Sequence, residues 1–301
     1  MKTKNRPMES HTQVIQSFLD LAETSPQEKE VIHNELTRYI ERRINNKWCH
    51  PIITKFHTDW YREFYRLVKN KDPYKKLKEE SNNVALQLVN KIPTKSFKDI
   101  LLATIIGNKI DFGACTRGIY NLDQLEKDLQ NIHQEKLVID DSELLDYRIQ
   151  SAKNILFLAD NNGEIIFDTL LFNYIRNYLP QERILIAGKE TPMLNDVTYD
   201  DLKRLKMHKF GKIISIGSNC FGLHEEDVSK EFKEILKNAD LIIAKGQAYL
   251  EFFSEYNFTN VFNILRVKHR VIGNGFGVLE EGGNAIISSE RYAEYGMNYI
   301  Y

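Results

Sequence analysis

The polar turn at residues 160–164, Asp-Asn-Asn-Gly-Glu, is the stretch of this sequence best suited to chemistry. It holds two carboxylates and two amides directly after an apolar run, and apolar residues at helical spacing follow it. This pattern predicts a buried strand, a polar turn and then a helix. In open α/β sheets, ligands bind beyond the carboxyl ends of the strands, where such turns lie. Carboxylate and amide oxygens in that position suit a hard cation such as Mg²⁺ or Mn²⁺.

Polar residues follow three further predicted strands in the same way. A loop ending in Asn195 and Asp196 follows the second strand, Ser218 and Asn219 follow the third, and Lys245 follows the fourth. Because the ends of parallel strands share one edge of the sheet, these side chains should surround a single crevice. Carboxylates there would hold a cation, and loop amides would bind phosphate oxygens, whose charge a lysine would offset. The set predicts metal-assisted phosphate chemistry.

Each of these residues also has an ordinary structural explanation. Asp160 and Asn161, at a strand–helix junction, would serve as helix caps, and Asp196 would cap the helix near residue 200. A single lysine such as Lys245 is usually a solvated surface residue. The recurrence of polar residues at successive strand ends favours a shared site over these separate explanations.

The elements that must position this site divide the chain near residue 150. Residues 1–150 show helical periodicity and no convincing strand, whereas residues 151–301 alternate between strands and helices, which is typical of βαβ units. We therefore predict an α/β protein with a helical N-terminal domain and a Rossmann-like, three-layer domain containing a mostly parallel sheet. The predicted strands are 155–159, 183–187, 212–216, 241–244 and 261–265, and the predicted helices between them are 164–178, 199–206, 228–238 and 247–256.

The overall composition excludes several classes of protein. The 301 residues carry a formal net charge of -1, so no basic field would attract nucleic acid. No apolar run approaches the roughly 18 residues that span a bilayer, and the first residues lack the apolar segment of a signal peptide. The three cysteines are scattered and odd in number, which indicates a reduced, cytoplasmic protein. The sequence gives no indication of the oligomeric state.

Several motifs, in this order and spacing, resemble those of the damage-control phosphatase family, also called the acidic-residue methyltransferase-like group. They are LADNNGEIIFD, NDVTYDD, IGSN-x-x-G and LIIAKGQ. Two upstream stretches are similar as well: DPY-x-x-x-K, from Asp72 to Lys78, and GN-x-x-D-F-G, from Gly107 to Gly113. The resemblance covers about residues 72–270, and it is the combination of motifs that makes it specific.

This resemblance implies a metal-dependent phosphatase that acts on small phosphorylated metabolites, with a helical N-terminal domain on a Rossmann-like domain. By motif position, Asp160, Asn161 and Asp196 would bind Mn²⁺, Co²⁺, Ni²⁺ or Mg²⁺. Lys245 would contact the substrate phosphate. Residues that would contact the substrate or support the ligands are Asn108, Asp111, Glu164, Asn195, Ser218 and Asn219.

Two candidates for the nucleophile follow from these assignments. Water activated by the metal would attack phosphorus directly, or Asp160 would form a phosphoryl-enzyme. The best-known aspartyl phosphatases carry an Asp-x-Asp pair, and here Asn162 stands at the second position. The sequence therefore favours attack by water, with Asp160 as the alternative.

Two other functions would use the same pocket. A carboxyl methyltransferase using S-adenosylmethionine would need a glycine-rich loop after the first strand and an acidic residue at the end of the second. Gly163 is a lone glycine, and the second strand ends in Gly188-Lys189, which disfavours that function. A non-catalytic sensor would bind phosphorylated metabolites without turnover. Tyr249 stands where the family usually has an asparagine, which leaves the substrate open.

Overall fold

The computed structural model describes residues 15, 16, 19, 24–45, 53–110, 122–267 and 283–294. Asp111 lies outside these ranges, so its predicted contact with the substrate stays a prediction. Cys49 and Cys115 also lie outside them, whereas Cys220 is a buried free thiol.

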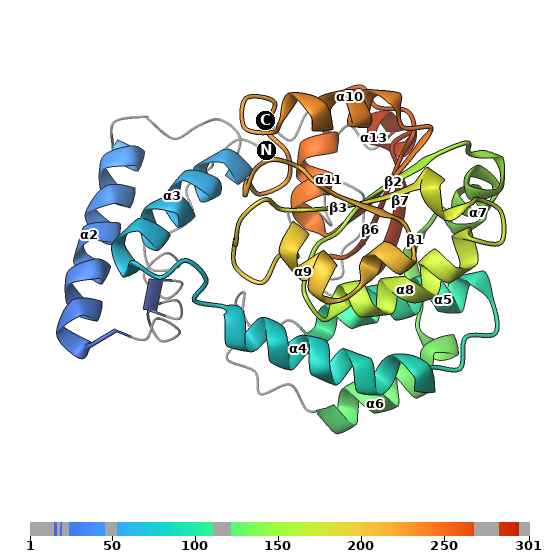
Figure 1. Ribbon diagram of the computed structural model, residues 1–301, viewed down its shortest axis with the longest axis horizontal. Helices are drawn as coiled ribbons and strands as arrows, with labels where there is room; N and C mark the ends of the chain where they lie inside the picture. Colours follow the sequence, from blue (N-terminus) through green and yellow to red (C-terminus); the bar gives the residue numbers. More distant parts are fainter. Residues whose placement is uncertain are drawn as a thin grey trace.

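The described residues form a seven-stranded sheet with the strand order β1-β7-β6-β5-β2-β3-β4 (Figure 1). All neighbouring strands run parallel except β6 and β7, which are antiparallel. The mostly parallel sheet predicted from the sequence is therefore confirmed. The strands are β1 (Leu137–Asp140), β2 (Ile155–Leu158), β3 (Ile184–Gly188), β4 (Lys212–Ser215), β5 (Leu241–Lys245), β6 (Val261–Arg266) and β7 (Asn284–Ser288).

The central strands are apolar because both faces of the sheet are covered. In β2, Ile155 and Phe157 belong to one hydrophobic cluster, whereas Leu156 and Leu158 belong to a second cluster on the other face. Successive side chains of a strand point to opposite faces, so a strand buried on both faces reads as a continuous apolar run. The five predicted strands agree with β2 to β6, although β4, at the end of the strand order, has only one buried residue.

Helices cover both faces of the sheet, which confirms the three-layer arrangement. The first cluster contains residues of α4, α5, α6, α7, α8 and α9, and the second contains residues of α10, α11 and α13. Figure 1 shows the two groups on opposite sides of the strands. Their bounds are α4 (Lys75–Leu88), α5 (Phe97–Ile106), α6 (Leu122–Gln130), α7 (Ser142–Ser151), α8 (Glu164–Ile175), α9 (Tyr199–Arg204), α10 (Lys230–Asn238), α11 (Gln247–Phe253) and α13 (Arg291–Glu294).

The N-terminal part of the chain contributes more to the sheet than the sequence suggested. The expectation of no strand before about residue 150 is wrong, because β1 lies at the edge of the sheet and pairs with β7. Its apolar run, residues 137–139, is only three residues long and is followed by Asp140 and Asp141, so β1 does not stand out as a strand. The predicted boundary between two domains at residue 150 stays a prediction.

Two N-terminal helices, α2 (Pro26–Asn45) and α3 (Ile53–Val68), stand beside the sheet and pack on neither face (Figure 1). Their apolar residues form a third cluster, which also includes Met193 and Leu194 from the loop after β3. This packing places α3 along the carboxyl edge of the sheet, which is the side where β2, β3, β4 and β5 have their carboxyl ends. Among the described residues, no helix has both the length and the apolar character needed to cross a membrane.

The order of the strands creates a switch point between β2 and β5. From β2 the chain moves through β3 to β4 in one direction, then returns to the other side of β2 to form β5 and β6. Connections on either side of this point lead away from each other, which opens a crevice at the carboxyl ends of the two strands. The polar turn at residues 160–164 begins at this crevice.

Candidate active site

The loops that follow β2 and β3 lie against each other. Asn161 and Asp196 form an isolated antiparallel bridge, and the backbone N–H of Val197 donates to the carbonyl oxygen of Asp160 at 2.8 Å. The structure therefore places Asp160, Asn161 and Asp196 side by side. Their role as metal ligands stays a prediction.

The helices that follow these loops are capped by other residues. Gly163, with φ of 81°, is the N-cap of α8 and makes no side-chain cap. Thr198 caps α9, and its hydroxyl accepts from the N–H of Asp201 in a capping box. The alternative explanation of Asp160 and Asp196 as helix caps is therefore wrong.

The carboxylate of Asp160 lies directly over the end of β5. A Cβ atom placed on Gly246 would be 2.0 Å from Oδ2 of Asp160, and Gly246 has a φ of 82°. Only glycine combines this backbone conformation with the absence of a side chain. Gly246 therefore allows the carboxylate to occupy the switch point, a role that the sequence did not reveal.

Lys245, the last residue of β5, is fully buried rather than solvated. Its ammonium group lies 2.9 Å from Glu164 and 2.9 Å from Asp168, and it donates to the carbonyl oxygen of Thr104 at 2.9 Å. Burial opposes its charge, but Asp168 and Glu164 outweigh burial and raise the pKa of Lys245. For Asp168, burial is the largest influence and raises its pKa to about 7, against the lowering effect of Lys245.

Glu164 connects this lysine to the predicted ligands. One carboxylate oxygen of Glu164 faces Lys245, and the other accepts from the amide nitrogens of Asn108 at 2.7 Å and Asn161 at 3.0 Å. The amide nitrogen of Asn161 also donates to Asp160 at 2.9 Å, which leaves Oδ1 as the atom with which Asn161 would coordinate an ion. Asn108 and Glu164 thus support the predicted ligands, and their contact with substrate stays a prediction.

Asn162 holds the two ligand loops together, and the sequence did not single it out. Its backbone N–H donates to the carbonyl oxygen of Asn195 at 2.9 Å. Its amide nitrogen lies within hydrogen-bonding distance of the carbonyl oxygens of Asn195 and Asp196, at 3.1 and 3.2 Å. Asn82 of α4 donates to the Asn162 side chain at 2.9 Å and accepts from the N–H of Gly163 at 2.7 Å. The shape of the turn therefore depends on a residue far away in the sequence.

Residues of the DPY-x-x-x-K motif support the turn at residues 160–164 from the protein interior. The buried ammonium of Lys78 lies 2.6 Å from Asp72 and 3.6 Å from Asp201. Asp201 accepts from the amide of Asn162 at 3.2 Å. Burial raises the pKa of Asp72, although Lys78 counteracts it. These residues brace the loop from within the protein.

Lys189, directly after β3, is a further fully buried lysine, and sequence reasoning missed it. Its ammonium donates to the carbonyl oxygens of Cys220 and Gly222. It also lies 3.8 Å from Asp196 and 4.9 Å from the centre of the Tyr249 ring. Its position at a strand end is the signal that could have identified it, because Lys245 was recognised in the same way.

Ser218 and Asn219, in the loop after β4, contact a residue of α3. Arg62 donates through Nε to the Asn219 side chain at 2.9 Å and through a terminal nitrogen to the Ser218 hydroxyl at 3.3 Å. Another terminal nitrogen lies 3.4 Å from Asp227, which also pairs with Lys55 of α3 at 3.0 Å. The helical part thus contributes a cation to this edge, although no sequence motif marks it.

The residues at this edge suit a divalent cation in both donor type and charge. Among the described residues, no group of three or more His, Cys, Asp or Glu side chains is arranged to hold a metal, so a bound cation would need an amide such as that of Asn161 as a further donor. Four carboxylates oppose two lysines in this cluster, which leaves a formal excess of two negative charges. The carboxylates belong to Asp160, Glu164, Asp168 and Asp196, and the ammonium groups belong to Lys189 and Lys245.

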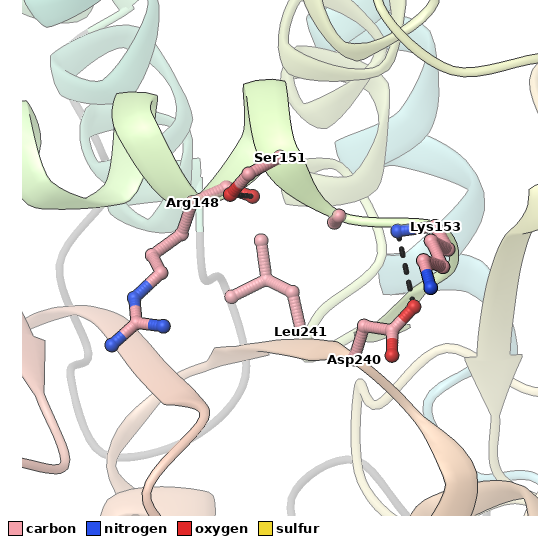
Figure 2. A pocket seen from close by; sticks show the side chains of 6 residues that line it. Arg148, Ser151, Lys153, Asp240 and Leu241 are labelled. Carbon is pink, nitrogen blue, oxygen red and sulfur yellow. Dashed lines mark hydrogen bonds between the residues drawn. The ribbon is translucent and has the colours of Figure 1, made fainter.

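The opposite edge of the sheet carries a hollow with different chemistry (Figure 2). This hollow, with a volume of about 180 Å³, lies between the end of α7 and the start of β5, and Arg148, Lys153 and Asp240 are among its lining residues. Asp240 accepts from the backbone N–H groups of Lys153 and Asn154, both at 3.0 Å, and its own N–H donates to the Asn154 side chain at 3.0 Å. The polar groups beside this hollow therefore link the amino ends of β2 and β5.

Comparison with known proteins agrees with the motif resemblance. Residues 4–281 match the model of the damage-control phosphatase ARMT1-like domain. A damage-control phosphatase of Pyrococcus horikoshii is 39% identical over 209 residues, covering 68% of this chain and 71% of that protein. Another, from Archaeoglobus fulgidus, is 28% identical over 235 residues, covering 76% and 80%. The crystal structure of a DUF89 family protein from Pyrococcus horikoshii aligns with a TM-score of 0.85 and 30% identity, covering 96% of this chain and 99% of that one.

Proposed function

Because the chain belongs to the damage-control phosphatase ARMT1-like family, we propose that it is a metal-dependent phosphatase that hydrolyses small phosphorylated metabolites. The observation that carries this proposal is the pairing of the loops after β2 and β3. It gathers Asp160, Asn161 and Asp196 at the switch point of the sheet, beside an excess of negative charge.

In this proposal, Asp160, Asn161 and Asp196 hold one Mn²⁺, Co²⁺, Ni²⁺ or Mg²⁺ ion. When bound, such an ion supplies a Lewis acid that polarises the phosphoryl group and lowers the pKa of water. Two carboxylates and an amide are the oxygen donors that hard divalent cations prefer. The excess of two negative charges in the surrounding cluster supports the same assignment.

We favour attack on phosphorus by water over the formation of a phosphoryl-enzyme on Asp160. The residue two positions after Asp160 is Asn162, whose amide is committed to Asn82, to the loop after β3 and to Asp201. An amide cannot serve as the general acid or base that the turnover of an aspartyl-phosphate needs. The amide nitrogen of Asn161 also donates to the Asp160 carboxylate and fixes its orientation, which suits Asp160 as a metal ligand.

Lys245 would stabilise the negative charge of the phosphoryl oxygens. Its ammonium is held by Glu164, Asp168 and the carbonyl oxygen of Thr104, so direct contact with a phosphate would replace one of these acceptors. In a buried site, a fixed positive charge is worth more than in water. Glu164, which contacts both Lys245 and Asn161, would fix their positions relative to each other.

The test is the release of phosphate from a generic aryl phosphate, with Mn²⁺, Co²⁺, Ni²⁺ or Mg²⁺ added after treatment with a chelator. We expect release only with a divalent ion, and a loss of more than about 100-fold in D160N and D196N, since even partners of metal ligands typically contribute 10- to 100-fold. Mn²⁺ should also raise the melting temperature of the wild-type chain but not of D196N.

The matched control is D240N, which removes a carboxylate at the other end of β5. It should retain phosphate release and the stabilisation by Mn²⁺. Full activity in both D160N and D196N would show that the assignment is wrong.

A further inference from the structure

The two buried lysines at the carboxyl edge are both committed to acceptors within the protein. Lys245 is held by Glu164, Asp168 and a carbonyl oxygen, and Lys189 by two carbonyl oxygens and Asp196. Both have essentially no exposed surface. They can stabilise charge within the site, but neither reaches the rim where the rest of a substrate would lie.

Arg62 differs from both lysines because its side chain is partly exposed. About a third of its side chain, 36%, remains accessible. Asn219 and Ser218 accept from two of its nitrogens, and Asp227 lies beside the third. A guanidinium has five N–H groups, and four hydrogen bonds to these three residues orient it. One N–H group is left without a partner among the described residues.

The position of Arg62 relative to the reactive centre follows from the sheet. Its partners Ser218 and Asn219 follow β4, which is two strands away from β2. Neighbouring strands are about 4.8 Å apart, so the carboxyl ends of β2 and β4, from which the loops of Asp160 and of the Arg62 partners start, are about 10 Å apart. The loop that carries Ser218 also meets Lys189, the neighbour of Asp196, so the two places belong to one continuous edge.

We infer that Arg62, oriented by Ser218 and Asn219, binds a second anionic group of the substrate, either a carboxylate or a further phosphate. The inference rests on the proposed phosphatase function and deepens it. The group that is hydrolysed lies at Asp160 and Asp196, and the second anion lies about two strand spacings away. A planar guanidinium binds carboxylate and phosphate oxygens with charge-assisted hydrogen bonds. Arg62 thus favours substrates with charge at both ends.

A role for Arg62 as a simple clamp between α3 and the loop after β4 explains less of the geometry. Lys55, in the same helix, already pairs with Asp227 at 3.0 Å and Glu226 at 3.1 Å. Thr58 accepts from the N–H of Phe221 at 3.0 Å. The docking of α3 therefore does not need a partly exposed arginine next to two polar side chains.

The experiment compares two probes that differ only at the end far from the phosphate: 6-phosphogluconate, with a carboxylate, and glucitol 6-phosphate, with a hydroxyl. Wild-type protein should favour the carboxylate by about tenfold or more in kcat/KM, mainly through KM, as expected for a charge-assisted hydrogen bond. In R62Q the preference should fall close to one, and R62K should keep part of it.

The matched control is R66Q, one turn further along α3, because among the described residues Arg66 pairs only with Glu63, at the surface. It should keep the wild-type preference. A clamp would change both probes equally in R62Q, so an unchanged preference in R62Q, or no preference in the wild type, would overturn the inference.

Calorimetric dissociation constants for the same two probes give a second readout that does not need turnover. If the wild type hydrolyses neither probe nor an aryl phosphate, the proposed function fails, but the binding preference and its loss in R62Q still test Arg62. If hydrolysis occurs without any preference in binding, the phosphatase stands and the anion site is wrong.

Discussion

Polar side chains join β2 and β5 at both ends of these strands, but the two ends differ in burial and in charge. At the amino ends, Asn154 and Asp240 exchange hydrogen bonds with each other and with nearby backbone N–H groups, all in exposed positions. At the carboxyl ends, Asp160 lies against Gly246 among buried carboxylates and lysines. The same two strands therefore have a hydrogen-bonded pair of side chains at their amino ends and a buried cluster with an excess of carboxylates at their carboxyl ends.

The difference shows how a structural polar link can be distinguished from a candidate site. An exposed pair such as Asn154 and Asp240 needs nothing more than water around it. A buried cluster with more carboxylates than ammonium groups destabilises the fold unless a cation or a proton balances it. Proteins retain such an arrangement where it serves a function, and each prediction below tests whether the carboxyl edge behaves in this way.

Replacing Gly246 with alanine should break the carboxyl edge most severely. The new Cβ would be 2.0 Å from the Asp160 carboxylate, on a residue with positive φ. Displacement of a reacting group by about 1 Å typically costs about 100-fold in rate, and backbone strain destabilises by about 1–3 kcal/mol. Measurement of phosphate release and of the melting temperature should show both losses.

The matched variant at the amino edge is G211A, whose Cβ would be 2.6 Å from the carbonyl oxygen of Ile184. It should lose stability but keep its activity per folded molecule. Equal losses of activity in G246A and G211A would mean that the two edges do not differ in function.

The sequence predicted the central sheet well because its signals are local. The apolar runs of β2 to β6 end in polar residues, and this alone indicated that Asp160 and Asp196 would lie at one edge. The edge strand β1 was missed because its apolar run, residues 137–139, is only three residues long and is followed by two aspartates. β7 follows a glycine-containing stretch and runs antiparallel to β6, so the βαβ pattern did not extend to it.

The residues that support the site were harder to predict because their partners are distant in the sequence. Asn82 and Asn162 are 80 positions apart, and Arg62 and Ser218 are 156 positions apart. Neither pair leaves a periodic pattern, since each depends on how α3 and α4 pack against the loops. Lys189 was not singled out because its local sequence shows only that it lies at a strand end, and not that carbonyl oxygens surround it.

The two asparagines that flank β2 offer the second test of the comparison. Asn162 follows the strand and is buried at 2% exposure, whereas Asn154 precedes it in an exposed setting. N162A should reduce phosphate release by about 10- to 100-fold, the range for partners of metal ligands. It should also destabilise the fold by about 1–3 kcal/mol, because buried carbonyl groups lose their donor.

N154A should cost only about 1 kcal/mol in stability and leave phosphate release unchanged, because its lost hydrogen bonds are replaced by water. Chemical denaturation and initial rates, measured on both variants, decide the matter. If N162A keeps wild-type kinetics, Asn162 supports the fold alone.

The smallest expected effect is a dependence of stability on pH that arises from Asp168. Burial raises the pKa of Asp168 to about 7, whereas an aspartate in the unfolded chain has a pKa near 3.9. Between about pH 4 and pH 7 the folded state therefore binds more protons than the unfolded state, so this residue makes stability fall as the pH rises, and its full penalty is present above about pH 7. D168N lacks this titration. Its free energy of unfolding, relative to that of the wild type, should improve by about 2–3 kcal/mol from pH 5 to pH 8.

This change with pH isolates the titration from the fixed cost of removing a partner of Lys245, because that fixed cost is the same at both pH values. Denaturation with urea at the two pH values, in the presence of a chelator, measures it. Saturating Mn²⁺ should reduce the wild-type dependence, since a nearby dication favours the ionised carboxylate. D240N, at the exposed amino edge, serves as the control and should follow the wild type at both pH values. A constant difference between D168N and the wild type from pH 5 to pH 8 would mean that the cluster at the carboxyl edge is already balanced, as its counterpart at the amino edge is.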